Sequence, residues 1–95
     1  MKMAKAIEST VLCDEKGTQW ELRYYAPKLD EPVGEPPYGL RIEQQAQGTA
    51  GILAEETRGL THSYDQAADW ARKLAKGKVL AMSLYELADD FTYMP

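Results

Sequence analysis

Residues 63–92 read SYDQAADWARKLAKGKVLAMSLYELADDFT and predict two consecutive helices. The tetrapeptides at 63–66 (SYDQ) and 83–86 (SLYE) both fit the S-x-x-[EQ] capping box. In that box the serine hydroxyl accepts the amide of residue N3, and the N3 side chain reaches back to the cap amide. Each serine is therefore expected to start a helix.

Apolar residues follow both boxes at the helical spacing i, i+3, i+4, i+7, so each helix has one apolar stripe that needs a partner. We expect the first helix over residues 64–76, ending where Gly77 supplies the left-handed C′ position. The second helix is expected over residues 84–92. Four large side chains should cover a sheet face: Trp70, Leu74, Leu87 and Phe91.

The region before the helices has the patterns of β-strands. Residues 4–26 are typical of a hairpin that turns at 14–17 (DEKG), because Gly17 can adopt a positive φ. A four-residue loop places Val11 opposite Trp20 on the apolar face and pairs Glu8 with Arg23 on the other face. The lone Cys13 beside this turn is interpreted as a small buried hydrophobe.

A second pair of strands is expected after a proline-rich connection. Residues 27–37 hold four of the five prolines and are interpreted either as a rigid connecting loop or as a binding loop. Alternation over residues 38–43 predicts a half-buried strand, and Gln47-Gly48 marks the turn into a strand over 49–55. Either Ile52 or Leu53 could face inward in this last strand.

These elements predict an α+β fold: a four-stranded antiparallel meander followed by two C-terminal helices packed on one sheet face. The chain is expected to form a single domain over 1–95, with a β-sheet half at 1–58 and a two-helix half at 59–95. The sheet face without helices should carry polar side chains and meet water: Glu21, Arg23, Tyr25, Arg41 and Glu43.

Composition limits the class of protein. Apolar residues make up 44% of the chain and charged residues 27%, which is typical of a folded globular domain. One cysteine excludes an intramolecular disulfide framework, and neither a signal-peptide-like segment nor an apolar run near 18 residues occurs. We therefore expect a cytoplasmic protein without membrane contact.

Charge argues against nucleic acid as a partner, because the net charge is −4 and phosphates require a clustered positive surface. A local basic cluster lies around the end of the first helix: Arg72, Lys73, Lys76 and Lys78. Cations favour a helix C-terminus, so the cluster is interpreted mainly as a response to the helix dipole. An anionic partner is the alternative.

Residues for catalysis are few. His62 is the only histidine, and a Cys13–His62 pair would need an activation that nothing in the sequence indicates. The acidic clusters lack the spacing of a calcium loop, and residues 48–51 (GTAG) lack the lysine of a phosphate-binding loop. We therefore predict no enzyme, no metal site and no cofactor.

Two segments resemble a small uncharacterised domain family of Gram-positive bacteria. Residues 78–91 (KVLAMSLYELADDF) are similar to the family's apolar connector and its closing "LY-[DE]-x-x-x-DF" helix. Residues 38–43 (YGLRIE) resemble its "YGI-x-I" strand. The resemblance implies a β-rich half followed by two helices and transfers no activity, so it supplies no site residue.

The leading hypothesis is a non-catalytic protein-interaction or regulatory module whose partner is another protein or a second copy. It rests on the strand edges, the proline-rich loop and the six tyrosines. One of the strand edges is only partly protected against pairing, by Lys2 and Lys5. The alternative is a small-ligand or single-stranded nucleic-acid binder that uses the open sheet face. The candidate interaction residues are Arg23, Tyr25, Arg41 and Tyr85.

Overall fold

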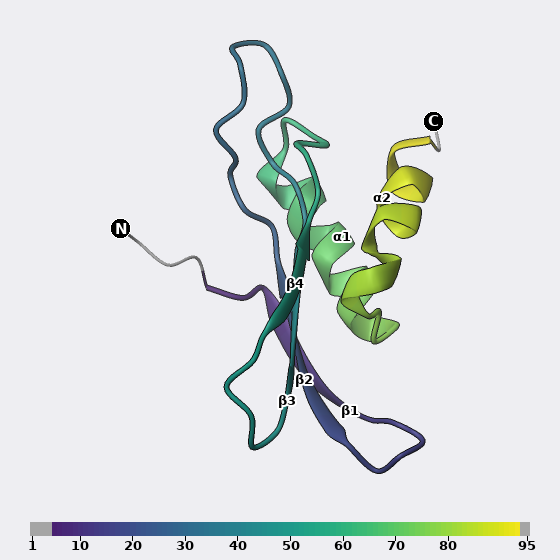
Figure 1. Ribbon diagram of the computed structural model, residues 1–95. Helices are drawn as coiled ribbons and strands as arrows, with labels where there is room; N and C mark the ends of the chain where they lie inside the picture. The colour runs from purple at the N-terminus through teal and green to yellow at the C-terminus, as the bar shows by residue number, and fades with distance from the viewer. Residues whose placement is uncertain (1–4, 94–95) are drawn as a thin grey trace.

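A computed structural model of the chain describes residues 5–93, so Lys2 lies outside the described part. Four strands come first, β1 (Glu8–Cys13), β2 (Gln19–Tyr25), β3 (Arg41–Ala46) and β4 (Leu53–Glu56). Three helical elements follow, α1 (Tyr64–Lys76), the short 3-10 turn η1 (Ala81–Ser83) and α2 (Leu84–Tyr93). The strands form one antiparallel sheet in the order β1-β2-β3-β4, with both helices on one side of it (Figure 1). The predicted α+β meander with two C-terminal helices is confirmed.

The predicted register of the first hairpin is wrong by one residue. Val11 lies opposite Glu21, and Leu12 lies opposite Trp20. The cause is Asp14, whose amide donates to the carbonyl of Thr18 and whose carboxylate accepts the amides of Lys16 and Thr18, both at 2.9 Å. These bonds close a loop one residue longer than expected. The slip turns Val11 to the helix-free face, where the residue is 47% exposed.

The core lies between the sheet and the helices. Leu22, Tyr24 and Ile42 are fully buried on the helix side of the sheet, against Leu74 of α1. The connector after α1 is fixed by two polar bonds: the Tyr24 hydroxyl donates to the Val79 carbonyl at 2.8 Å, and the buried Gln44 side chain accepts the Ala81 amide at 2.9 Å. The expected covering residues Leu87 and Phe91 are only partly buried, since α2 reaches the core through Leu84 and Ala88.

The two helix starts differ. Ser63 is the N-cap of α1 and accepts the Gln66 amide at 3.1 Å, as predicted, but the Gln66 side chain accepts from the Thr61 hydroxyl instead of reaching the Ser63 amide. Ser83 is not a cap, because it lies inside the 3-10 turn that leads directly into α2. The second capping-box prediction is therefore wrong.

α1 ends at Lys76 as predicted, but the left-handed residue that follows it lies one position later than expected. Gly77 has φ −86°, and Lys78 takes the left-handed conformation with φ 49°. The Lys78 amide donates to the Ala75 carbonyl at 3.0 Å and the Val79 amide to the Leu74 carbonyl at 3.1 Å. This is the Schellman arrangement with lysine at C′, a position where glycine is usual.

The proline-rich connection is an arm that continues the β2–β3 hairpin beyond the sheet (Figure 1). The Leu29 amide donates to the Pro37 carbonyl at 2.6 Å, and Tyr38 bridges both Lys28 and Thr61. Prolines are tolerated because their carbonyls serve as acceptors while other residues donate. Glu31 anchors the arm by accepting the Gly59 amide at 2.9 Å. The connection is thus an ordered extension held by bridges, which supports its interpretation as a rigid connection.

Candidate functional site

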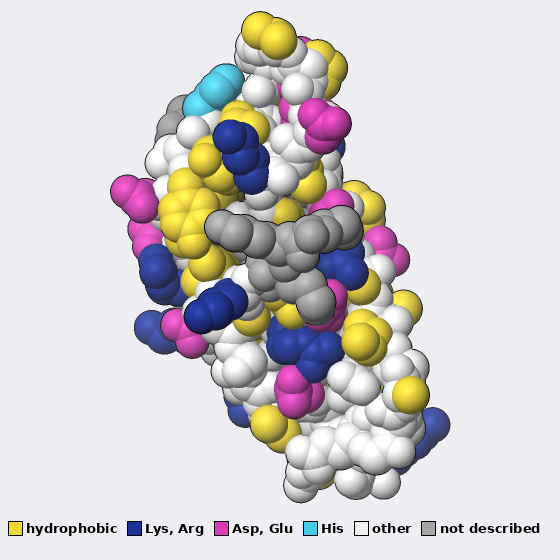
Figure 2. Space-filling model, turned by 90° about the vertical axis from the view of Figure 1, so that its left-hand side faces the viewer, with side chains coloured by type: hydrophobic (Ala, Val, Ile, Leu, Met, Phe, Trp, Pro, Cys, Tyr) yellow, Lys and Arg dark blue, Asp and Glu magenta, His cyan; other side chains and the backbone are white. Residues whose placement is uncertain are grey.

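The open sheet face gathers three of the four predicted interaction residues around one carboxylate. Glu43 accepts from the Arg23 guanidinium at 3.1 Å, the Tyr25 hydroxyl at 2.8 Å and the Arg41 guanidinium at 3.1 Å. The expected Glu8–Arg23 pair does not form, because Ser9 stands opposite Arg23. Glu21, Gln45 and Glu56 complete what we call the open-face cluster: Glu21, Arg23, Tyr25, Arg41, Glu43, Gln45 and Glu56. Interleaved basic and acidic side chains are visible on this face (Figure 2).

The charged side chains of the open-face cluster bind mainly one another. Burial raises the pKa of Glu43, but the hydrogen bonds from Tyr25, Arg23 and Arg41 outweigh burial, so its pKa lies below the ordinary value of 4.5. Hydrogen bonds to two carboxylates raise the pKa of Arg23, and the bond to Glu21 contributes more than the bond to Glu43. They outweigh burial, which lowers this pKa. Three carboxylates face two guanidinium groups, so the cluster carries one net negative charge.

We expect Glu43→Gln to lower the free energy of unfolding at pH 7 by about 1–2 kcal/mol, because two arginines lose their shared carboxylate. A carboxylate with a lowered folded-state pKa contributes stability above its unfolded pKa and loses it as the pH falls. Urea unfolding at pH 7 and pH 3 should therefore show the gap between wild type and variant narrowing in acid. Glu15→Gln, in the exposed first turn, is the control for net charge. A gap of equal size at both pH values would contradict a role for the Glu43 charge.

Tyr85 lies away from the open-face cluster. It belongs to α2, is 53% exposed, and donates its hydroxyl to the backbone carbonyl of Glu56 at 2.9 Å. With Thr57, Arg58 and Leu60 it lines a shallow hollow of about 290 Å³ beside the end of β4. The four predicted residues therefore form two separate regions.

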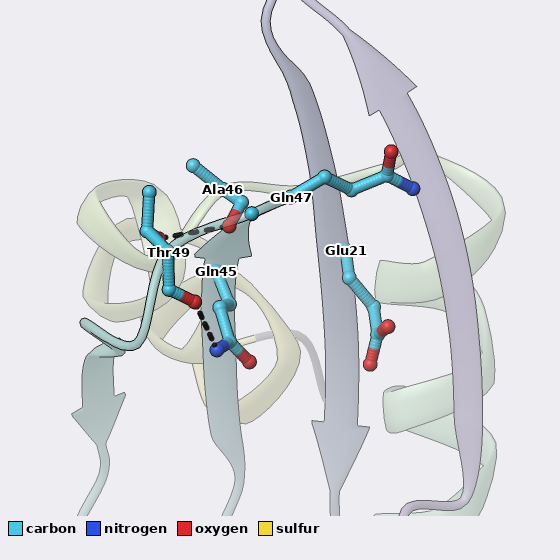
Figure 3. Close-up of a pocket in the computed structure, with 6 residues that line it drawn as sticks. Glu21, Gln45, Ala46, Gln47 and Thr49 are labelled. Atoms are coloured by element: carbon cyan, nitrogen blue, oxygen red, sulfur yellow. Dashed lines mark hydrogen bonds between the residues drawn. The ribbon is translucent and has the colours of Figure 1, made fainter.

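A second hollow, of about 240 Å³, lies at the β3–β4 turn next to the cluster. Gln45 and Glu21 line it from neighbouring strands, and the Gln45 amide donates to the Thr49 carbonyl at 2.8 Å (Figure 3). The Glu21 carboxylate already accepts from Arg23, and the other polar groups that line the hollow are neutral amides, carbonyls and a hydroxyl. The hollow gives no indication of a specific chemistry.

The outer edge of β1 offers backbone groups instead of side chains. The bond from the Asp14 amide to the Thr18 carbonyl fixes which pairs of the β1–β2 ladder are hydrogen-bonded, and this pattern alternates along antiparallel strands. Ser9, Val11 and Cys13 therefore point their N–H and C=O groups outward. Within residues 5–93 no strand pairs with this edge.

A groove runs beside this edge. Its volume is about 290 Å³; β1 contributes Glu8, Ser9 and Thr10, and α1 contributes Arg72, Ala75 and Lys76. The helical spacing explains the arrangement: Ala71 and Leu74 point into the core, and the residues that follow them on the helix surface flank β1. The unpaired outer edge of β1 and one side of α1 therefore line the same groove.

The opposite edge of the sheet is better protected. β4 has four residues, and η1 lies against it. The bond from the Thr57 amide to the Leu40 carbonyl shows that Ala54 and Glu56 point their backbone groups outward. The Glu56 carbonyl is already bound by Tyr85. Of the two edges, β1 is therefore the more accessible to an added strand.

Cys13 and His62 lie at opposite ends of the sheet. Cys13 pairs with Gln19 next to the first turn, whereas His62 follows Thr61, which bridges Tyr38 beyond the other end. Cys13 is exposed, so its interpretation as a buried hydrophobe is wrong. In the described part of the chain, no three His, Cys, Asp or Glu residues are placed to hold a metal ion. No helix within residues 5–93 is both long and apolar enough to cross a membrane.

Strand alternation predicts Glu43 on the open face but does not indicate its central position among the arginines. The signal was present, since Glu43 lies opposite Arg23 in the β2–β3 pair and two positions from Arg41. From the sequence, Arg72 and Lys76 are interpreted mainly as a response to the helix dipole, with an anionic partner as the alternative, and no pattern places them beside β1. Only the packing of α1 against β1 brings them beside the strand edge.

The fold and its surfaces define a class: a small α+β domain with one helix-covered sheet face, one polar face whose charged side chains pair with one another, and a first strand whose outer edge is unpaired in the described residues. The chain belongs to a family of unknown function, DUF6514, which matches residues 3–94. This confirms the resemblance to an uncharacterised domain family. No curated protein and no solved structure is significantly similar to the chain.

Proposed function

We propose that this domain is a non-catalytic protein-binding module that binds an extended segment of its partner along the outer edge of β1. The observation that carries the proposal is the row of outward N–H and C=O groups at Ser9, Val11 and Cys13, beside an open groove. In strand addition, such an edge supplies affinity through main-chain bonds, and flanking pockets supply specificity.

The length and character of β1 support this proposal. An edge of six residues is long enough for several main-chain bonds, and β1 carries no proline. The nearby lysine that could defend it, Lys5, precedes the strand instead of lying within it. A bound strand would remove an unpaired edge that otherwise remains open to aggregation.

The alternative proposal, binding of a small ligand or single-stranded nucleic acid to the open face, has weaker support. Arg23 and Arg41 are engaged by Glu43, and Tyr25 donates its hydroxyl to the same carboxylate. A phosphate would have to displace Glu43 from a cluster whose net charge is already negative. These residues suit a rigid platform better than an anion receptor.

A proline at an outward-facing position tests the proposal. Peptides about ten residues long would be selected from a displayed random library against the wild-type domain, and their dissociation constants measured by titration calorimetry. Val11→Pro removes an outward N–H and leaves the bonds to β2 intact, so we expect at least a tenfold loss of affinity for the selected peptides.

The matched control is Ala54→Pro, which removes an outward N–H from the opposite edge. We expect it to change the affinity less than twofold. Urea unfolding of both variants verifies that each is folded. Peptides that bind wild type and Val11→Pro equally well would show that binding does not use the β1 edge.

A further inference from the structure

We infer that the segment accepted by β1 is acidic, with carboxylate side chains at alternate positions that enter the groove beside α1. This inference rests on the proposed strand addition and adds the chemistry of the partner. Alternate residues of an added strand would point to the helix side of the sheet, where Arg72 and Lys76 line the groove. The remaining residues would extend the open face next to the exposed Val11.

The charges around the groove favour a carboxylate over a cation. Arg72 and Lys76 provide two positive charges, and Glu8 provides the negative charge among the lining residues. Asp69 contacts one guanidinium nitrogen of Arg72 at 3.2 Å, with both side chains more than half exposed. An exposed pair of this kind is weak, and the guanidinium keeps further N–H donors for an incoming carboxylate.

The same charges argue against a second copy as the occupant. Antiparallel pairing of two β1 strands across a twofold axis would keep both α1 helices on one face of the joined sheet. Arg72 and Lys76 of one copy would then approach the same two residues of the other. Like charges brought together at an interface oppose association. A segment from an acidic protein meets no such repulsion.

The probes are two synthetic peptides about eight residues long, within the usual range of strand lengths. In one, valine alternates with glutamate, and in the other valine alternates with glutamine. Both would be titrated into the ¹⁵N-labelled domain at low and high salt, with the amide shifts of β1 as readout. We expect the glutamate peptide to bind about fivefold more tightly at low salt, and this preference to shrink in high salt.

The double variant Arg72→Glu/Lys76→Glu should abolish or invert the preference for the glutamate peptide. Lys28→Glu/Lys73→Glu changes the net charge equally at exposed positions that do not line the groove and should keep the preference. Equal binding of both peptides to wild type would overturn the acidic partner and leave strand addition intact. The proposed function itself would be overturned by two results together: neither peptide changes the amide shifts of β1, and Val11→Pro leaves the affinity for the library peptides unchanged.

The last measurement is the oligomeric state of the domain without peptide. Light scattering over a wide concentration range should show a monomer. A dimer that Val11→Pro dissociates would mean that a second copy occupies the edge, which overturns the acidic partner while retaining the role of the β1 edge.

Discussion

Gly59→Ala is expected to reduce the free energy of unfolding by about 3 kcal/mol or more, one of the two largest effects we expect from a single substitution here. A Cβ atom at this position would lie 1.8 Å from the carbonyl oxygen of Pro36 and 2.9 Å from its carbonyl carbon. Both atoms belong to the backbone of the arm, so the clash is relieved only by moving the arm away. That movement would also break the bond from the Gly59 amide to Glu31.

Thermal unfolding followed by circular dichroism measures this effect, and a loss of about 3 kcal/mol corresponds to a midpoint lowered by roughly 15 °C for a domain of this size. Gly51→Ala is the control, because a Cβ atom there meets nothing within 4 Å. It should leave the midpoint nearly unchanged. Similar midpoints for both variants would mean that the arm does not pack on Gly59 as described.

Trp70→Ala is expected to cost about 3–4 kcal/mol. Trp70 is 8% exposed and stacks on Phe91 with ring centroids 5.4 Å apart and an angle of 4° between the rings. This contact joins α1 to α2. Removing the indole deletes core volume and leaves the Phe91 ring without its stacking partner, so α2 should open more often than the sheet.

Hydrogen exchange separates these two consequences. In Trp70→Ala we expect the amides of α2 (Leu84–Tyr93) to lose more protection than those of β2 and β3. Trp70→Phe keeps an aromatic ring against Phe91 and should restore most of the protection of α2 at a smaller cost in global stability. Uniform loss of protection in both variants would show that the stack does not hold α2 specifically.

The candidate surfaces were only partly accessible from the sequence. Period-2 alternation placed Arg23, Tyr25 and Arg41 on one sheet face, and their common face is what the structure has. Alternation gives no distances, so it could not identify Glu43 as their shared acceptor. The groove could not be predicted from the sequence, because Arg72 and the β1 residues are some sixty positions apart in the chain. They become neighbours only when α1 packs against the sheet.

Local signals alone determined the meander, the bounds of α1 and the face of each helix that is buried, because strand alternation, turn residues and the Ser63 cap act over a few neighbouring residues. Two details of the backbone were set by competition among polar groups within short segments, which these patterns do not resolve. The Asp14 carboxylate lengthened the first turn and shifted the register, and the Schellman arrangement placed Lys78 where Gly77 was expected. Tertiary structure decided which edge of the sheet is accessible, since η1 and Tyr85 lie against β4 and no strand of the described chain pairs with the outer edge of β1. Which edge is left free depends on where distant elements pack, and no local pattern in the strands encodes that position.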